Sequence, residues 1–191
     1  MTSDTCATSF RSARVFIAGA FATMTLLGGS AALATGGRTV FVSGNSTFSS
    51  DCGVEGSDYA ILLTGNLEGC LSTWVQSFKC RELADYDFYS EAGREVFIGS
   101  LRGKQGRFAT DYTFDAAYAK GFCKTFNAGL EVGGGCIHTI TRGSGVFRNA
   151  EGVITFIDVI AGVTGNPVTG EFTAGTGGNN FLYSGRIHLE D

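Results

Sequence analysis

Residues 108–116, FATDYTFDA, alternate between two kinds of side chain. Phe108, Tyr112 and Phe114 occupy one set of alternate positions, whereas Asp111 and Asp115 occupy the other. Because successive side chains of a β-strand point to opposite faces, this pattern predicts a strand with one buried face and one wet face. The same period of two ends the chain, in the sequence FLYSGRIHL at residues 181–189.

Further stretches show strand patterns, and no stretch has the spacing of an amphipathic helix. Tyr59, Ile61, Leu63 and Leu67 indicate one strand, and Trp74, Gln76 and Phe78 share one face of another. Additional candidates are Thr39 to Phe48, Ala84 to Tyr89, Arg94 to Arg102, Cys136 to Thr141 and Val153 to Ile160. Glycine-containing turns separate these segments. About eight antiparallel strands with short turns leave a sandwich or a closed barrel, and large aromatics on one face of successive strands favour an eight-stranded antiparallel β-barrel.

The composition excludes several classes of protein. With 43% hydrophobic and 17% charged residues the chain has enough apolar side chains for a core, which excludes a wholly disordered protein. The net charge of −4 leaves no basic surface for phosphates, so no nucleic-acid partner is expected. The motifs G-x-S-x-G and H-E-x-x-H are absent and no complete Walker loop occurs, so hydrolase, metalloprotease and nucleotide-cofactor functions are not predicted, and we expect no cofactor.

The first 34 residues have the features of a secretory signal peptide. Arg11 and Arg14 precede a run without charge at residues 15–37, and Ala32-Leu33-Ala34 supplies a cleavage site of the A-x-A type. The uncharged run is long enough for an uncleaved membrane anchor, but its threonines, serine and glycines favour cleavage. We therefore expect a secreted, extracellular protein that has no membrane contact once the leader is removed.

The remaining residues, 35–191, form a single predicted barrel domain with five cysteines, which outside the cytosol indicate disulfides. A bridge from Cys70 to Cys80 is disfavoured, because the ends of one strand over this distance lie about 30 Å apart. We predict the pairs Cys52 with Cys80 and Cys123 with Cys136, and a free Cys70. No C-x-x-C occurs and His138 and His188 lie far apart in sequence, so no metal site is predicted.

The stretch Val153 to Ile160 is apolar on both faces, although only one face can fill a barrel. Something therefore covers the outer face. We expect a partner subunit, and the alternative is the glycine-rich segment of residues 161–180, which otherwise forms a long loop at one barrel end.

Two glycine motifs carry a family resemblance. The run Glu95-Val96-Phe97-Ile98-Gly99-Ser100-Leu101, followed by Gly103 and Gly106-Arg107-Phe108, resembles the F-x-G-x-x-x-G-x-x-G-x-F hairpin of bacterial proteins related to the allene oxide cyclase barrel. Residues 143–152, GSGVFRNAEG, look like the turn that this barrel shares with plant dirigent proteins. The resemblance implies an eight-stranded antiparallel barrel, often trimeric, that binds a small apolar molecule in its mouth. The acidic and polar residues of the plant cyclase have no matched positions here, so cyclase activity is not carried over.

Candidate ligand-binding residues are the inward aromatics and one histidine: Trp74, Phe78, Tyr112, Phe114, His138 and Tyr183. The aromatics either line a ligand cavity or fill a plain core. His138 is either a general base or a hydrogen-bonded wall residue. The second interpretation is favoured, because no carboxylate lies at an obvious pairing distance in sequence. Two functions follow: a secreted barrel that binds a small apolar ligand, or a cofactor-independent cyclase or isomerase acting on a hydrophobic substrate. They are distinguished by whether Gln76, Glu95, His138 or Glu151 points into a cavity of ligand size.

Overall fold

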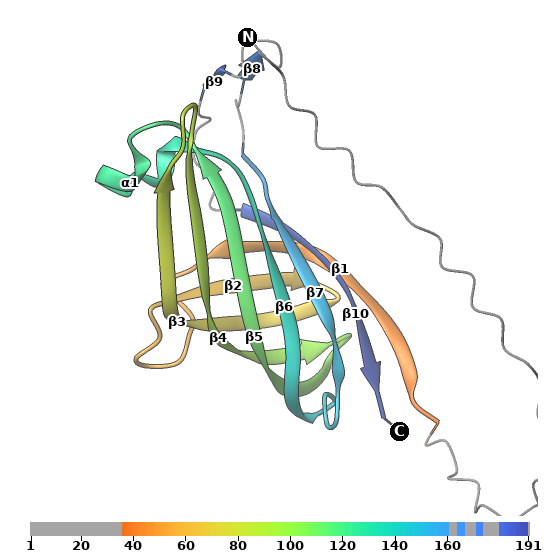
Figure 1. Cartoon of the computed structure of the whole chain (residues 1–191). Coiled ribbons are helices and arrows are strands. Elements are labelled where there is room, and N and C mark those ends of the chain that lie inside the picture. The colour runs from red at the N-terminus through yellow and green to blue at the C-terminus, as the bar shows by residue number, and fades with distance from the viewer. Residues whose placement is uncertain (1–35, 161–163, 167–170, 174–179, 191) are drawn as a thin grey trace, which may run out of the picture. The chain divides into compact units, whose positions relative to one another are not determined.

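The computed structural model describes residues 36–160, 164–166, 171–173 and 180–190. Within these residues, eight antiparallel strands form one sheet in the order β1-β10-β7-β6-β5-β4-β3-β2, and β2 pairs with β1, so the sheet closes in a ring (Figure 1). The strands of the ring are β1 (Arg38–Phe48), β2 (Tyr59–Gly65), β3 (Leu67–Glu82), β4 (Asp87–Leu101), β5 (Lys104–Tyr118), β6 (Glu131–Gly145), β7 (Glu151–Asp158) and β10 (Asn180–Leu189). The short strands β8 (Thr164–Asn166) and β9 (Glu171–Thr173) pair with each other in a sheet of their own. The predicted all-β fold of eight antiparallel strands is confirmed.

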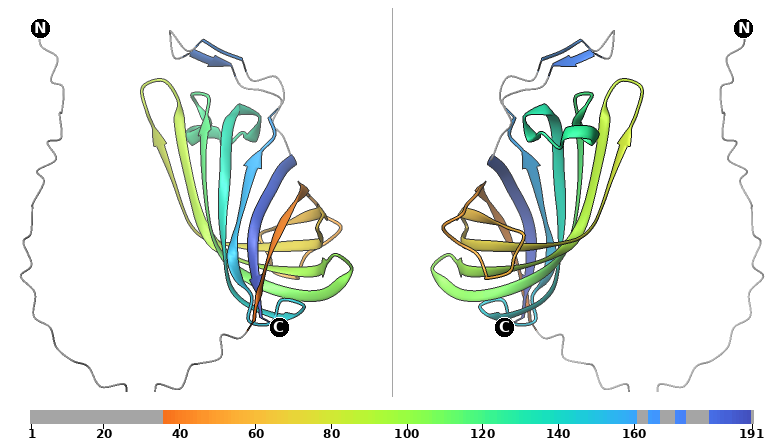
Figure 2. Two further views of the ribbon diagram at one scale, coloured as in Figure 1. Left: turned by 90° about the vertical axis from the view of Figure 1, so that its right-hand side faces the viewer. Right: turned by 90° about the vertical axis from the view of Figure 1, so that its left-hand side faces the viewer.

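The turn between β4 and β5 illustrates how glycine sets the hairpins. Arg102 and Gly103 are its two central residues, with φ angles of 50° and 82°. Positive φ at both positions matches the twist of the flanking strands, and glycine adopts it without steric cost. The two long strands then pair over their full length, from Leu101 with Lys104 to Asp87 with Tyr118. Both curl strongly along their length, as the two side views show (Figure 2).

An apolar core fills one end of the ring. Phe97 and Phe108 stack with their ring centroids 4.7 Å apart, and Phe147 packs edge-on against both rings. Phe97 and Phe147 have no exposed surface. Phe147 comes from the connection between β6 and β7, so the predicted glycine turn of residues 143–152 contributes a core side chain at this end of the ring. Burying rings of this size contributes about 1.5–3 kcal/mol each.

The opposite end of the ring lies beside the helical turn α1 (Phe122–Thr125) and a 3-10 turn (Ala128–Leu130), neither of which was predicted. The Phe122 ring stacks on Tyr118 at a centroid distance of 3.6 Å. The fully buried Asp87 at the start of β4 fixes the segment: its carboxylate accepts hydrogen bonds from the backbone N–H groups of Gly121 and Cys123, both at 3.0 Å, and from Lys120 at 2.9 Å. We call this the α1 end.

Two expectations about strands need correction. Ala84 to Tyr89 and Arg94 to Arg102 were expected as separate strands, but one strand, β4, runs through both. Glycine is needed at position 93, near the middle of this strand, because a Cβ would clash with the carbonyl oxygen of Trp74 and would approach the Tyr112 ring to 2.8 Å. The shared face expected for Trp74 and Phe78 is also wrong. A bulge between Val75 and Ser77 inserts one residue into β3, which moves every later side chain to the other face.

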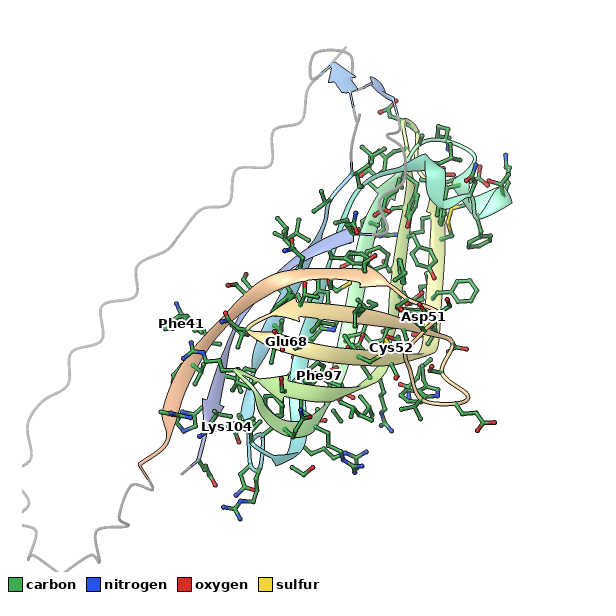
Figure 3. The ribbon with its side chains drawn as sticks, turned by 180° about the vertical axis from the view of Figure 1, so that it is seen from behind. Phe41, Asp51, Cys52, Glu68, Phe97 and Lys104 are labelled. Atoms are coloured by element: carbon green, nitrogen blue, oxygen red, sulfur yellow. A yellow bond between two sulfur atoms is a disulfide. The ribbon has the colours of Figure 1, made fainter. Side chains whose placement is uncertain are left out.

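The predicted disulfide pairing is wrong as well. Cys52 bonds to Cys70, and Cys80 bonds to Cys123, which leaves Cys136 as the one free cysteine among the described residues. The chain turns at Gly65–Asn66, between β2 and β3, and the loop after β1 that carries Cys52 (Figure 3) lies beside the outer side of β3 near Cys70. The bulge in β3 directs Cys80 toward α1, where Cys123 lies. The expectation that four of the five cysteines of residues 35–191 are paired is confirmed.

The strand β7 has the two apolar faces that the sequence indicates. Ile154 and Phe156 are each 1% exposed and fill the ring, whereas Val153 and Ile157 point outward and are 43% and 59% exposed. The predicted signal peptide (residues 1–34) and most of the predicted glycine-rich loop (residues 161–180) lie outside the described residues.

Candidate ligand-binding site

A buried carboxylate lies at the centre of a polar network inside the ring. Glu95 on β4 is 1% exposed. It accepts a hydrogen bond from Thr73 on β3 at 3.1 Å and another from Thr110 on β5 at 2.7 Å. Its Oε2 atom lies 2.5 Å from Nδ1 of His138 on β6. Four neighbouring strands therefore each place one polar side chain toward the same point, which satisfies a charge that would be costly to bury alone.

His138 is the hydrogen-bond partner of the Glu95 carboxylate, although the sequence indicated no carboxylate partner for this histidine. The two residues are 43 positions apart, and only the pairing of β4, β5 and β6 brings them together. The imidazole ring packs against Phe156 at a centroid distance of 4.2 Å and stacks on Tyr112 at 6.0 Å. When Nδ1 donates to Glu95, Nε2 becomes the free nitrogen of the ring, and it is buried without a hydrogen-bond partner among the described residues.

A second carboxylate, Glu91, lies on the same face of β4, four residues nearer the α1 end. Tyr59, Tyr89 and Tyr112 donate hydrogen bonds to it at 2.9, 2.6 and 2.5 Å. Burial, and next the charge of Glu91, raise the pKa of Tyr59, while burial and the hydrogen bond to Glu91 raise the pKa values of Tyr89 and Tyr112. These hydroxyls therefore remain protonated donors at physiological pH. Glu91, Tyr59 and Tyr89 were not predicted as site residues, because nothing in their local sequence marks them as partners.

A cavity of about 220 Å³ lies at the α1 end, next to this second network. Its lining contains Glu91, Cys136 and eight aromatic rings: Phe48, Tyr59, Tyr89, Phe114, Tyr118, Phe122, Phe126 and Phe181. We call it the aromatic cavity. It is smaller than the ~300–1,000 Å³ of typical drug-binding pockets and therefore suits a small ligand. The disulfide from Cys80 to Cys123 ties α1, which supplies Phe122, to the end of β3.

The six predicted ligand-binding residues occupy different places. Phe114 lines the aromatic cavity, and Tyr112 and His138 belong to the two polar networks beside it. Tyr183 is buried in the core, where its hydroxyl bonds to the backbone of Leu67. Phe78 is 58% exposed and stacks on Tyr89. Trp74 lies on the outer face, paired with the exposed Arg94.

Trp74 borders two hollows on the outer surface of β3 to β6, of about 340 and 550 Å³. Arg94, Arg107 and Arg142 contribute to their walls. These hollows are larger than the aromatic cavity, and the buried Glu95 and Thr110 border the larger one. The side chains of these two residues, however, hydrogen-bond to each other in the interior network. The buried networks converge instead on the interior, which makes the aromatic cavity the better candidate site.

Gln76 and Glu151, which were considered as interior polar residues, are both exposed. Among the described residues, no cluster of three His, Cys, Asp or Glu side chains is arranged to hold a metal ion. Nor does the described part of the chain contain a helix that is both long and apolar enough to cross a membrane.

The chain matches no known family model, and neither a curated protein nor a solved structure is similar enough to it to count as a relative.

Proposed function

We propose that this protein is a secreted barrel of the allene oxide cyclase and dirigent-like type, and that it binds a small molecule with an apolar body in its aromatic cavity. The observation that carries the proposal is the cavity itself, where eight aromatic rings line about 220 Å³ at the α1 end of the ring. An apolar ligand gains about 25 cal/mol for each Å² of surface that it buries there. The predicted leader and the two disulfides support export, because disulfides persist in oxidising compartments.

Native mass spectrometry of protein exported by its own host tests this function. We expect the folded chain to carry a non-covalent small-molecule adduct that is lost on denaturation. The variant Cys136→Phe places a ring in the cavity, and its folded state can be checked by circular dichroism. This variant is expected to lose the adduct and the rise in melting temperature that a small apolar compound such as neopentylbenzene gives the unmodified protein. The absence of both effects in the unmodified protein, or their persistence in Cys136→Phe, contradicts the proposal.

The pair formed by Glu95 and His138 favours a second candidate function, the cofactor-independent rearrangement of a hydrophobic substrate. A carboxylate that orients a histidine and leaves its second nitrogen without a partner is the arrangement of a general base. The test compares the small molecules extracted from the unmodified protein and from His138→Gln, both purified from the same host. An isomer found only with the unmodified protein supports catalysis, whereas the same molecule in both samples contradicts it.

A further inference from the structure

Two carboxyl groups, those of Glu131 and Asp158, lie at the α1 end beside the aromatic cavity. Glu131 begins β6 and is 7% exposed. Asp158 ends β7, and its carboxyl group lies over Gly134, where a Cβ would also meet Phe114. Both oxygens of Asp158 and Oε1 of Glu131 are buried without a hydrogen-bond partner among the described residues. Buried polar atoms of this kind are rare in native proteins, so each calls for a partner that the described residues do not supply.

The pair faces other acidic groups rather than bases. Its titratable neighbours are Tyr118 on β5 and Cys136 on β6, with Tyr89 and Glu91 on β4 further along the same interior. The two lysines near α1 are already paired, Lys120 with Asp87 at 2.9 Å and Lys124 with Glu82 at 3.3 Å. Burial, and next the adjacent Asp158 carboxyl group, raise the pKa of Glu131 to about 9. Burial raises the pKa of Asp158 as well, so the two carboxyl groups together hold a proton at neutral pH.

This pair adjoins the rings of the cavity wall. The pKa of Tyr118 is raised by burial and then by the charges of Glu131 and Asp158, and that of Cys136 by burial and then by Asp158. Tyr118 and Cys136 both line the aromatic cavity, as does Phe114, whose ring and the Asp158 carboxyl group both lie next to Gly134. A fully apolar ligand would leave the carboxyl oxygens desolvated and unpartnered. A cation would satisfy them, and its charge would also be attracted to the faces of the rings.

We propose that the ligand of the aromatic cavity is an organic cation with an apolar body, an amine or a quaternary ammonium, whose charged head lies against Glu131 and Asp158. This inference rests on the proposed binding function and narrows its ligand class. The head displaces the proton that the two carboxyl groups share, and the apolar body contacts the aromatic wall.

Paired probes separate this inference from the binding function itself. Benzyltrimethylammonium and neopentylbenzene have the same shape and differ in charge. We expect the cation to bind at least tenfold more tightly, measured by calorimetry or by the shift in melting temperature. Equal binding of the two probes overturns the cation inference and leaves the binding function standing. Binding of neither probe contradicts both.

Variants test whether the carboxyl pair is responsible. Glu131→Gln and Asp158→Asn each keep the shape of the side chain and are expected to weaken binding of benzyltrimethylammonium at least tenfold, with binding of neopentylbenzene unchanged. Asp115→Asn is the matched control, because it makes the same change of charge on the exposed outer face of β5. An equal effect in Asp115→Asn would show that the net charge of the molecule, and not the carboxyl pair, attracts the cation, and would overturn the proposal.

The shared proton gives an independent readout. Calorimetry in buffers of different ionisation enthalpy is expected to show release of close to one proton for each cation bound at pH 7, and a release that falls to zero above the pKa of Glu131, about 9. Glu131→Gln should abolish this release. Cation binding that releases no proton at pH 7 contradicts the assignment of the site to this pair, and a purely structural acid pair gives that result.

Discussion

The hydroxyl of Tyr183 ties β10 to the start of β3. It accepts a hydrogen bond from the backbone N–H of Leu67 at 2.9 Å and lies 3.1 Å from the carbonyl oxygen of Thr64. Leaving such a buried amide without a partner costs about 1–3 kcal/mol. We therefore expect Tyr183→Phe to lower the free energy of unfolding in urea by about that amount. Tyr86→Phe, in the turn between β3 and β4, is the control, and an equal loss in both variants would rule out the assigned role.

Two buried acids predict how stability changes with pH. Burial alone would raise the pKa of Asp87, but its hydrogen bonds from the N–H of Cys123, from Lys120 and from the N–H of Gly121 outweigh burial and lower this pKa from 3.8. The ionised Asp87 therefore stabilises the folded state, and this contribution is lost as the pH falls below about 4. The pKa of Glu131 is raised from 4.5 to about 9, so the folded state holds a proton that the unfolded state releases, and stability declines as the pH rises through this range.

The melting temperature is therefore expected to be highest near pH 5. Asp87→Asn should reduce the loss of stability on the acid side, and Glu131→Gln should reduce the decline on the alkaline side. Each variant serves as the control for the other, since each is expected to change the melting temperature on only one side of the pH of maximal stability. A profile in Glu131→Gln that parallels that of the unmodified protein would contradict the role given to Glu131.

At the scale of single residues, the sequence predicts which side chains face the interior of the ring better than it predicts which of them contact one another. Tyr112, Phe114 and His138 could be placed in the interior because strict alternation fixes their face. Their partners could not be identified. Glu95 meets His138, and Glu91 meets three tyrosines, only after strands far apart in sequence pair in a specific register. The paired carboxyl groups of Glu131 and Asp158 give no local signal for the same reason.

At the scale of elements, one extra residue in β3 accounts for several differences from expectation. The bulge between Val75 and Ser77 leaves Trp74 outside the ring and turns Phe78 and Cys80 to the other face. Nothing in the composition of this stretch marks the bulge, which depends on how β3 pairs with β4. The number and direction of the strands are less sensitive, because they follow from the period of two and from the glycine turns.

The two disulfides are expected to differ in their effect on the cavity. The bridge from Cys80 to Cys123 closes 43 residues and that from Cys52 to Cys70 closes 18. Each bridge stabilises the fold by restricting the unfolded chain, more so when the closed loop is longer. Replacing the cysteines by serine is therefore expected to destabilise the protein by about 4 kcal/mol for the first bridge and about 3 kcal/mol for the second. Only the first bridge holds α1 and Phe122 beside the cavity. We therefore expect Cys80→Ser with Cys123→Ser to weaken binding of benzyltrimethylammonium, with Cys52→Ser plus Cys70→Ser as the control. Equal binding by the two double variants would contradict the role of α1.

At the scale of the whole molecule, the ring exposes large apolar side chains on neighbouring strands of its outer face. Leu182 of β10 pairs directly with Ile157 of β7, and they are 52% and 59% exposed. Ile137 and Val153 on β6 and β7 extend this surface, as does Phe41 on β1, which points outward (Figure 3) and packs against Arg186. We call these five apolar residues the outer patch. A long exposed apolar face of a sheet favours association.

We predict that the outer patch is covered by further copies of the chain, with a trimer as the assembly that the family resemblance implies. Each large side chain buried in such an interface contributes about 1.5–3 kcal/mol. Ile157→Glu places a charge at the centre of the patch without disturbing the interior, which Phe156 fills from the other face of β7. Sedimentation should therefore show a soluble monomer that keeps the circular dichroism of the unmodified protein. Gln76→Glu, on the opposite side of the ring, is the matched control and should stay oligomeric. A monomeric unmodified protein at micromolar concentration would contradict the interface and would direct attention to residues 161–180 as the cover.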